Sequence, residues 1–289
     1  MKRLQSFKWR LARPVLIAAA LLTVAGSVTA AELPKSPEVM KTGKLTVANT
    51  LEYAPFEFTG EDGKPTGVNI ELAAEAARQL GVELDLVRIP FTSMIPGLAA
   101  GRFKISWETF SPTEDRLKQV DFVVFLKAGT VASTTREKAA AFGTENNLCG
   151  KRVGIVAGNV ADFTADKLNK VCKEAGLPEI SKAVFPEAKD IVQAVLSGRV
   201  DARLDDATSS GYYEVISGGK LVVVKGLYDM SPLGIAVPKG DTETAEMMRA
   251  VLQVMIENGT YQKVMAKYGL TSAMVDKAYI VDSMDKVRK

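Results

Sequence analysis

Arg116 is the residue whose neighbours most clearly suggest chemistry. It lies in the stretch FSPTEDRLKQVDF, residues 110–122, shortly after Ser111 and Thr113. A guanidinium group offers paired donors that match a carboxylate in two parallel hydrogen bonds. The two hydroxyl residues can add hydroxyl or backbone donors to the same anion. The stretch therefore predicts an anion-binding site, and a solvated loop leading into a strand is the alternative.

The residue types that are missing exclude several kinds of site. The chain has no histidine, which excludes Ser/His and Cys/His nucleophilic arrangements. Its two cysteines are not placed as zinc ligands. Neither a P-loop nor a dinucleotide-binding glycine pattern is present. We therefore expect no metal and no cofactor.

The first 30 residues have the composition of a Sec-type secretory signal peptide. Five basic residues and no acid precede an apolar run over residues 15–26, and small residues follow up to Ala30. This order is typical of a signal peptide cleaved after Ala30, and about a dozen apolar residues are too few to span a bilayer. The mature chain is therefore predicted to be a soluble periplasmic protein.

Removal of this segment makes the net charge slightly negative. The whole chain has 37 Lys and Arg against 34 Asp and Glu, so the loss of five basic residues leaves 32 against 34. Nothing in this balance indicates a nucleic-acid partner. Residues 31–289 are numerous enough for one large domain or two smaller ones.

Cys149 and Cys172 are predicted to form a disulfide bond. An even number of cysteines in an exported chain favours pairing. Residues 151–157 have the pattern of a strand, and residues 160–172 that of a helix running back over nearly the same length, so their far ends should meet. Two buried free thiols are the alternative.

The hydrophobic pattern predicts two α/β units of similar size. In the first unit, strands and helices are expected to alternate over residues 44–49, 69–80, 83–89, 92–100 and 103–108. In the second unit they are expected to alternate over residues 152–157, 160–174, 181–185, 187–197, 200–204 and 206–217.

Two extended apolar segments, residues 124–134 and 221–237, border the second unit and are expected to cross between the units. Helices over 241–257 and 260–268 have no sheet of their own, so they should return to the first unit. The pattern leaves residues 270–289 unassigned.

These elements predict a two-lobed α/β fold with two crossing strands. Residues 31–128 and 234–289 would form a discontinuous first lobe, and residues 129–233 an inserted second lobe. Open α/β sheets bind ligands beyond the carboxyl ends of their strands. We therefore expect a hinged molecule with a ligand cleft between the lobes.

Seven stretches, in order along nearly the whole mature chain, resemble one known family. They are KLTVANTLEYAPFEF, DGKPTGVNIELAAEAARQLGVELD, MIPGLAAGRF, SPTEDRLKQVDF, CGKRVGIVAGN, LSGRVDARLDDATSSGYY and ENGTYQKVMAKYG. The chain resembles the family 3 extracellular solute-binding proteins, the amino-acid-binding receptors of ABC importers. The resemblance implies a type II periplasmic-binding-protein fold. It also implies a receptor, expected to be a monomer, that delivers an amino acid or similar small zwitterion to an ABC transporter permease.

The resemblance also implies the residues that hold the ligand's charged groups. Arg116 stands where the family holds the α-carboxylate, with Ser111 nearby. Asp206 stands where the family pairs the α-ammonium, and Asp205 is the rival for this role. A carboxylate facing a cation in a closed, partly dry cleft is a physically sound partner.

Other positions of the family's site carry over with changes. Tyr53 and Phe91 match positions that sandwich the ligand's side chain, with core packing as the alternative. Residues 158–160 match a loop that opens a helix, whose free N–H groups favour an anion. Because Asn159 and Val160 replace the family's usual hydroxyl residues there, only backbone donors are expected.

The segment FKISWE departs from the family in two places. Lys104 stands where an acid is common, and Glu108 where a small residue near the ligand's side chain is common. The family's binders of cationic amino acids use acids near positions matching Thr50 and Asn69, both uncharged here. Since a buried unpaired carboxylate is costly, Glu108, beside Thr109 in the expected site, should meet either a ligand cation or an internal lysine.

The competing function is an enzyme on the same scaffold, resembling the cyclohexadienyl dehydratases. Glu108 in a dry cleft could have a raised pKa and act as a general acid. A sensory module of a membrane receptor is disfavoured because no transmembrane segment follows the lobes. We therefore expect a binding protein and not an enzyme.

Overall fold

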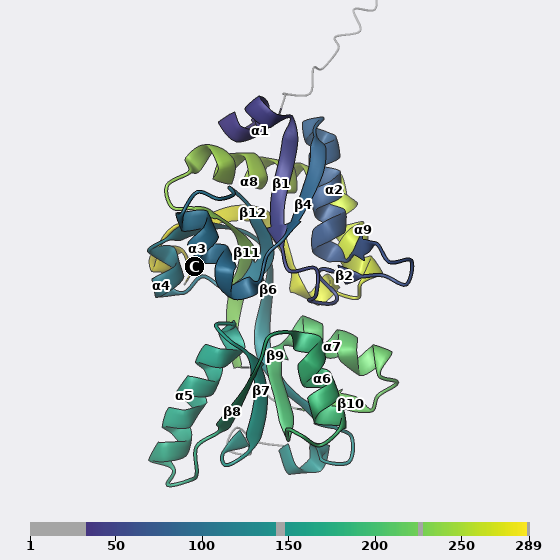
Figure 1. Ribbon diagram of the computed structural model, residues 1–289, viewed down its shortest axis with the longest axis vertical. Helices are drawn as coiled ribbons and strands as arrows, with labels where there is room; N and C mark the ends of the chain where they lie inside the picture. The colour runs from purple at the N-terminus through teal and green to yellow at the C-terminus, as the bar shows by residue number, and fades with distance from the viewer. Residues whose placement is uncertain (1–32, 143–147, 225–227, 288–289) are drawn as a thin grey trace, which may run out of the picture. The chain divides into compact units, whose positions relative to one another are not determined.

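The computed structural model describes residues 33–142, 148–224 and 228–287 (Figure 1). The predicted signal peptide, residues 1–30, lies outside the described residues. None of the described helices is long and apolar enough to cross a membrane.

The described residues form a mixed α/β fold. The strands are β1 (Lys44–Asn49), β2 (Phe58–Thr59), β3 (Pro65–Thr66), β4 (Glu83–Arg88), β5 (Ser106–Phe110), β6 (Val120–Thr135), β7 (Arg152–Val156), β8 (Ser181–Phe185), β9 (Ala202–Asp206), β10 (Leu221–Val223), β11 (Tyr228–Pro238) and β12 (Met274–Val281). The helices are α1 (Pro37–Thr42), α2 (Val68–Leu80), α3 (Phe91–Ala99), α4 (Glu114–Leu117), α5 (Val160–Glu174), α6 (Ala188–Leu196), α7 (Ala207–Ile216), α8 (Thr242–Glu257), α9 (Thr260–Lys267) and α10 (Met284–Val287).

In the first lobe, β1 pairs in parallel with β4 and β5, and β11 pairs antiparallel with β5. Its apolar core combines residues that are far apart in the sequence, such as the fully buried Leu45, Trp107, Leu252 and Tyr261. Helices α8 and α9 therefore pack into the same core as β1 and β5. Because apolar surface is buried jointly by the two ends of the chain, this lobe depends on both of them.

In the second lobe, β7 lies between β8 and β9 and is parallel to both. A separate core includes the buried Val153, Ile155, Leu168 and Leu204. Alternating strands and helices place α5, α6 and α7 against this part of the sheet, as expected for parallel strands.

Two strands run between the lobes, as the sequence predicts (Figure 1). β6 pairs with β11 over Val120–Thr130 and then with β9 over Thr130–Ser133. The prediction of two α/β lobes joined by crossing strands is therefore confirmed. The lobe boundaries proposed from the sequence stay a prediction.

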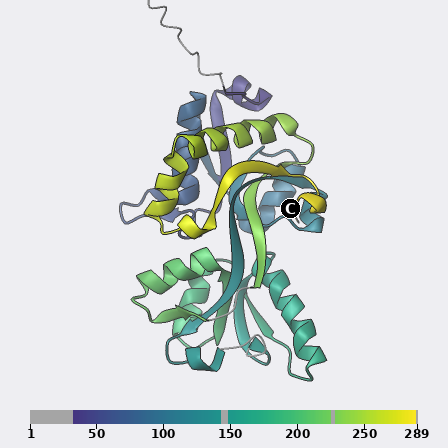
Figure 2. The same ribbon diagram turned by 180° about the vertical axis from the view of Figure 1, so that it is seen from behind.

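The unassigned C-terminal residues contribute a strand. β12 pairs antiparallel with β6 beside Phe122, Val123 and Val124 (Figure 2). Its burial does not alternate, because Asp276 and Lys277 are exposed in the middle of the strand, where the pairing is also irregular. Strand prediction relies on alternation, so the sequence pattern gave little indication of this element.

Two strands that carry candidate residues begin later than predicted. The expected strand over residues 103–108 is β5, Ser106–Phe110, and the one over 200–204 is β9, Ala202–Asp206. Both strands bury polar or charged side chains, among them Glu108 and Arg203. The hydrophobic pattern ended the second predicted strand before the buried carboxylates Asp205 and Asp206, and the predicted bounds of both strands were wrong.

The loop that carries Tyr53 is fixed against the start of α2. The backbone N–H groups of Val68 and Asn69 donate to the carbonyls of Pro55 and Phe56, at 3.1 and 2.8 Å. Gly67 has a φ of 118°, and a Cβ at this position would lie 2.3 Å from the Phe56 oxygen. Only glycine allows this close approach, so the loop and α2 form one local unit.

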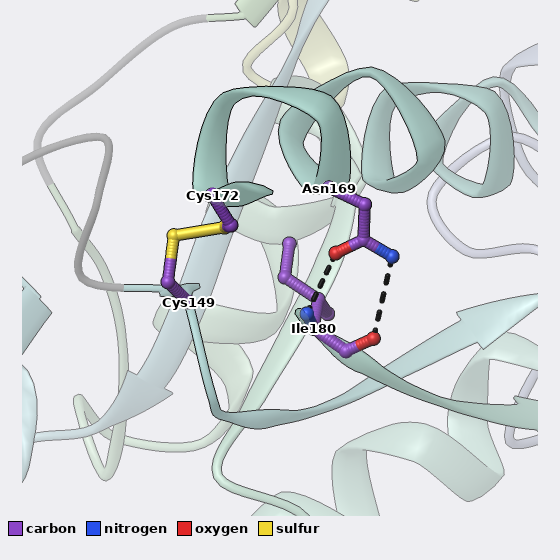
Figure 3. The surroundings of a disulfide bond; sticks show 4 residues. All are labelled: Cys149, Asn169, Cys172 and Ile180. Carbon is purple, nitrogen blue, oxygen red and sulfur yellow. Dashed lines mark hydrogen bonds between the residues drawn. A yellow bond between two sulfur atoms is a disulfide. The ribbon is translucent and has the colours of Figure 1, made fainter. Parts of the chain in front are cut away.

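The predicted disulfide between Cys149 and Cys172 is present (Figure 3). It links the segment before β7 to the last turn of α5. The Asn169 side chain, one turn earlier in α5, accepts from the Ile180 N–H at 2.6 Å and donates to the Ile180 carbonyl at 3.4 Å. Both connections hold α5 to the segments that lead into β7 and β8.

Replacing both cysteines by Ala is expected to lower the free energy of unfolding of the second lobe by about 3 kcal/mol, because the cross-link restricts the unfolded chain. The bridge spans 23 positions. Urea denaturation followed by circular dichroism measures the effect, and chemically reduced wild-type protein is the control. A change of less than about 1 kcal/mol would show that the loop-closure argument does not apply.

Candidate functional site

A cavity of about 500 Å³ lies between the two lobes. Its walls follow the carboxyl ends of β1, β4, β7 and β8, where ligands of open α/β sheets bind. Five of the predicted site residues lie on its wall: Tyr53, Phe91, Glu108, Thr109 and Asn159.

The other predicted ligand residues lie behind this wall. Arg116 donates through Nη2 to the carbonyl of Gly158, at 2.5 Å, and Gly158 lies between the wall residues Ala157 and Asn159. Asp206 accepts a hydrogen bond from the hydroxyl of Tyr53. Asp206 therefore bonds to a wall residue, and Arg116 to the chain neighbour of two wall residues.

Ser111 and Val160 also lie off the wall. Ser111 contributes its carbonyl, which accepts from Arg116 Nη1 at 2.9 Å, and Val160 is the first residue of α5. In the loop before it, the Gly158 N–H donates to Asp162 at 3.0 Å and the Asn159 N–H donates to the Val156 carbonyl at 3.2 Å. Two of the backbone donors expected for an anion are thus already bonded within the protein.

Arg116 is a buried cation. Its backbone N–H is capped by the Thr113 hydroxyl at the start of α4, at 3.3 Å, and its side chain is 7% exposed. The guanidinium lies over the rings of Phe91 and Phe110, 5.7 and 5.4 Å from their centroids. Burial lowers the pKa of Arg116 to about 10.

The hydrogen-bond acceptors of Arg116 are neutral. Within the described residues, its side chain bonds to two carbonyl oxygens and to no carboxylate. A buried charge without a counter-charge is costly. The site is therefore suited to an anion that can approach this guanidinium.

Asp205 and Asp206 have different surroundings. Asp205 forms an ion pair with Arg203, and both side chains are buried, at 2% and 0% exposure. Arg203 also donates to the Ser209 hydroxyl at 2.7 Å. The charge of Asp205 is thus already neutralised by a cation of the protein itself.

Asp206 instead caps α7 and accepts from neutral donors. Its Oδ1 accepts from the Ser209 N–H at 2.8 Å and from the Thr208 hydroxyl. The Tyr53 hydroxyl lies within hydrogen-bond distance of its Oδ2 and also of Asp205 Oδ1, at 2.8 Å, and can donate its one proton to either. Burial and the charge of Asp205 raise the pKa of Asp206. Among the described residues, Asp206 is the carboxylate of this pair that lacks a cation.

Phe91 and Tyr53 both line the cavity and pack against other rings. The Phe91 ring stacks on Phe110, with centroids 5.2 Å apart, and the Tyr53 ring stacks on Phe56 at 5.6 Å. Both side chains are half-buried. Their predicted ligand-packing role and its alternative, core packing, therefore fit the structure equally.

Glu108 does not meet an internal lysine among the described residues. It is 2% exposed and accepts from the Thr50 N–H at 2.6 Å. Lys104, the lysine nearest to it in the sequence, lies 3.5 Å from Asp241. The ionisable neighbour of Glu108 is another carboxyl group, that of Glu57.

Glu57 is fully buried, and the sequence analysis did not identify it. Its Oε2 accepts from the Asn69 amide at 2.6 Å, and its Oε1 lies 3.4 Å from the Thr50 hydroxyl. Burial, followed by the Glu108 charge, raises the pKa of Glu57 well above its usual range. Burial also raises the pKa of Glu108, but hydrogen bonds from Glu57 and Thr50 oppose that rise. The ionisation of Glu57 is therefore disfavoured more strongly than that of Glu108.

A cluster of four charges, three of which lie on the cavity wall, was also missed by the sequence analysis. Arg88 pairs with Glu52 and lies 3.7 Å from Glu187, while Lys189 lies 2.7 Å from Glu187 and 3.7 Å from Glu52. Glu52 and Arg88 stand at the carboxyl ends of β1 and β4, a position that could have marked them. Since Glu187 and Lys189 belong to the second lobe, the cluster connects the lobes.

The described residues contain no group of three or more Cys, Asp or Glu side chains that could hold a metal ion.

Comparison with known proteins gives consistent similarities. Residues 45–271 match the family model of bacterial extracellular solute-binding proteins, family 3. The arginine-binding protein ArgT of Corynebacterium glutamicum is 28% identical over 84% of this chain and 80% of its own length. The histidine-binding periplasmic protein of Salmonella typhimurium is 26% identical over 78% of this chain and 87% of its own.

Solved structures that are similar to this chain include further amino-acid-binding proteins. An ancestral amino-acid-binding protein, described as a precursor of cyclohexadienyl dehydratase, has a TM-score of 0.73 at 30% identity, covering 80% of this chain and 97% of its own. The holo arginine-binding protein of T. maritima has a TM-score of 0.69 at 28% identity, covering 80% and 98%. Both cover most of the two-lobed fold.

Proposed function

Because the chain belongs to the bacterial extracellular solute-binding proteins of family 3, we propose that its solute is an amino acid or a similar small zwitterion. One observation carries this proposal. Arg116 is a buried cation in the first lobe without a counter-charge, and Asp206 is a buried carboxylate in the second lobe without a cation, among the described residues. A zwitterion supplies the missing charge to each.

Ligand binding would exchange contacts within the protein for contacts with the solute. The α-carboxylate takes the place of the Gly158 carbonyl at Arg116, and the α-ammonium takes the place of the Tyr53 hydroxyl at Asp206. Each exchange replaces a neutral partner by a charged one, which strengthens the hydrogen bond. A solute that contacts both lobes in this way favours the state in which they are close.

The transport role follows from this capture step. The protein releases its solute to the permease of an ABC importer, and it acts outside the cytoplasm as a monomer. The relatives named for binding arginine and histidine support an amino acid as the solute. Asp205 is not proposed as a ligand residue, because Arg203 already neutralises it.

A dehydratase on the same fold is the second candidate. Glu108 lies on the cavity wall and has a pKa raised by burial, as a general acid would require. The similar ancestral structure described as a precursor of such an enzyme is itself named an amino-acid-binding protein. We propose binding without chemistry as the function.

Isothermal titration calorimetry of the mature protein with the common L-amino acids tests the proposal. We expect one-to-one binding of at least one of them, and nuclear magnetic resonance spectra should show that the ligand stays unchanged. Incubation with arogenate or prephenate should yield no product. If no amino acid binds, or if either compound is converted, the proposed function is wrong.

A further inference from the structure

We infer that Glu108 binds a cationic group of the ligand's side chain, and that Glu57 is the positioning residue that holds the Glu108 carboxylate in place. The inference rests on the proposed function and names its ligand class: an amino acid whose side chain ends in an ammonium or guanidinium group. Glu108 and Thr50 are the residues that connect this acid pair to the cavity.

The charges on the cavity wall do not balance, because one carboxylate has no cation to pair with. The charged wall residues are Glu52, Arg88, Glu108 and Glu187. Arg88 and Lys189 together neutralise Glu52 and Glu187, since each cation lies within ion-pair distance of both acids. Glu108 is then the wall carboxylate that has no cation among the described residues.

The ligand's α-groups leave this imbalance unchanged. The α-carboxylate is neutralised by Arg116 and the α-ammonium by Asp206, so neither compensates Glu108. A neutral side chain would leave a buried carboxylate without a counter-charge, whereas a cationic side chain would supply one. The charge balance of the closed site therefore requires a third ionic group, with positive charge, on the ligand.

Glu57 keeps the negative charge on Glu108. Two adjacent buried carboxyl groups cannot both ionise at low cost, so one retains a proton. Glu57 has no exposed surface and is fixed by the Asn69 amide at 2.6 Å. Glu108 accepts from the Thr50 N–H at 2.6 Å and lies on the cavity wall, as Glu57 does not. The pair thus carries one negative charge, on the residue that faces the cavity.

The acid pair also sets the pH dependence of binding. Glu108 has a raised pKa, so as the pH falls it becomes neutral at a higher pH than an ordinary glutamate. Its charged neighbours are Glu57 and, on the same cavity wall, Glu52, Arg88 and Glu187. Affinity for a cationic side chain is therefore expected to fall with decreasing pH, and affinity for a neutral one is not.

Two matched ligand pairs test the inference by calorimetry: L-arginine with L-citrulline, and L-lysine with L-norleucine. Each pair differs in charge with little change of shape. For at least one pair, the wild-type protein should bind the cationic member at least about 100-fold more tightly. Glu108→Gln should reduce this preference to within about threefold, with circular dichroism confirming the fold.

Two variants of Glu57 separate positioning from packing. Glu57→Gln keeps an N–H donor toward Glu108 and should retain the preference for the cationic ligand. Glu57→Val removes the donor that lowers the pKa of Glu108. In that variant the loss of arginine or lysine affinity should occur at a higher pH than in the wild type, a shift that a packing role alone would not produce.

Equal affinity for charged and neutral members in the wild type, or an undiminished preference in Glu108→Gln, would overturn the inference. If neutral amino acids bind and depend on Arg116, the inference is wrong but the proposed function stands. If no amino acid of any class binds, both are wrong.

Discussion

Arg116→Ala is expected to weaken binding of the amino acid by about 100- to 3,000-fold. Its removal leaves the ligand's carboxylate unpaired in a buried site, which costs about 3–5 kcal/mol. The side chain has no ion-pair partner in the described part of the protein, so the fold should be retained. Calorimetry measures the affinity, and thermal denaturation measures the stability.

Two further variants control this prediction. Arg116→Lys keeps the charge but loses the paired donors, so its affinity should lie between those of the wild type and Arg116→Ala. Arg78→Ala removes an exposed arginine whose partner is Glu75 and should change the affinity by less than about twofold. Unchanged affinity in Arg116→Ala would refute the assigned role.

Asp205→Asn is expected to reduce mainly the stability of the protein, and Asp206→Asn mainly its affinity for the ligand. Asp205→Asn leaves the fully buried Arg203 without its counter-charge, so it should lower the free energy of unfolding by about 3–5 kcal/mol. Asp206→Asn keeps an oxygen that can accept from the Ser209 N–H, and asparagine is an equally good N-cap. It should change the stability by less than about 1 kcal/mol.

For ligand affinity, Asp206→Asn should have the larger effect of the two variants. Asp206→Asn removes the charge that faces the α-ammonium and should weaken binding by about 100-fold or more. Urea denaturation and calorimetry on the same two variants measure both effects. If Asp205→Asn were stable and Asp206→Asn still bound the ligand tightly, the two aspartates would have been assigned the wrong roles.

The two lobes and their crossing strands could be predicted because apolar periodicity and the order of elements follow from local sequence. Strand β12 could not, because Asp276 and Lys277 interrupt its pattern and its pairing partner, β6, is about 150 residues away in the sequence. Where tertiary pairing determines a strand, local patterning is a weak guide.

The candidate site, too, could be predicted from the sequence only in part. The resemblance to known receptors picked out Arg116 and Asp206. It gave no indication that burial and the Glu108 charge raise the pKa of Glu57, or that Arg203 neutralises Asp205. Whether a buried charge is compensated depends on a residue that is distant in the sequence, so it becomes visible only in the fold.

A cycle of ligand analogue and variant tests the central claim most directly. The affinities of the bound amino acid and of its α-carboxamide are measured by calorimetry for the wild type and for Arg116→Ala. We predict that amidation weakens binding to the wild type by about 100-fold or more. It should weaken binding to the variant by less than about threefold, because the partner of the lost charge is already absent. An equal loss in both proteins would show that Arg116 does not bind the carboxylate and would contradict the account.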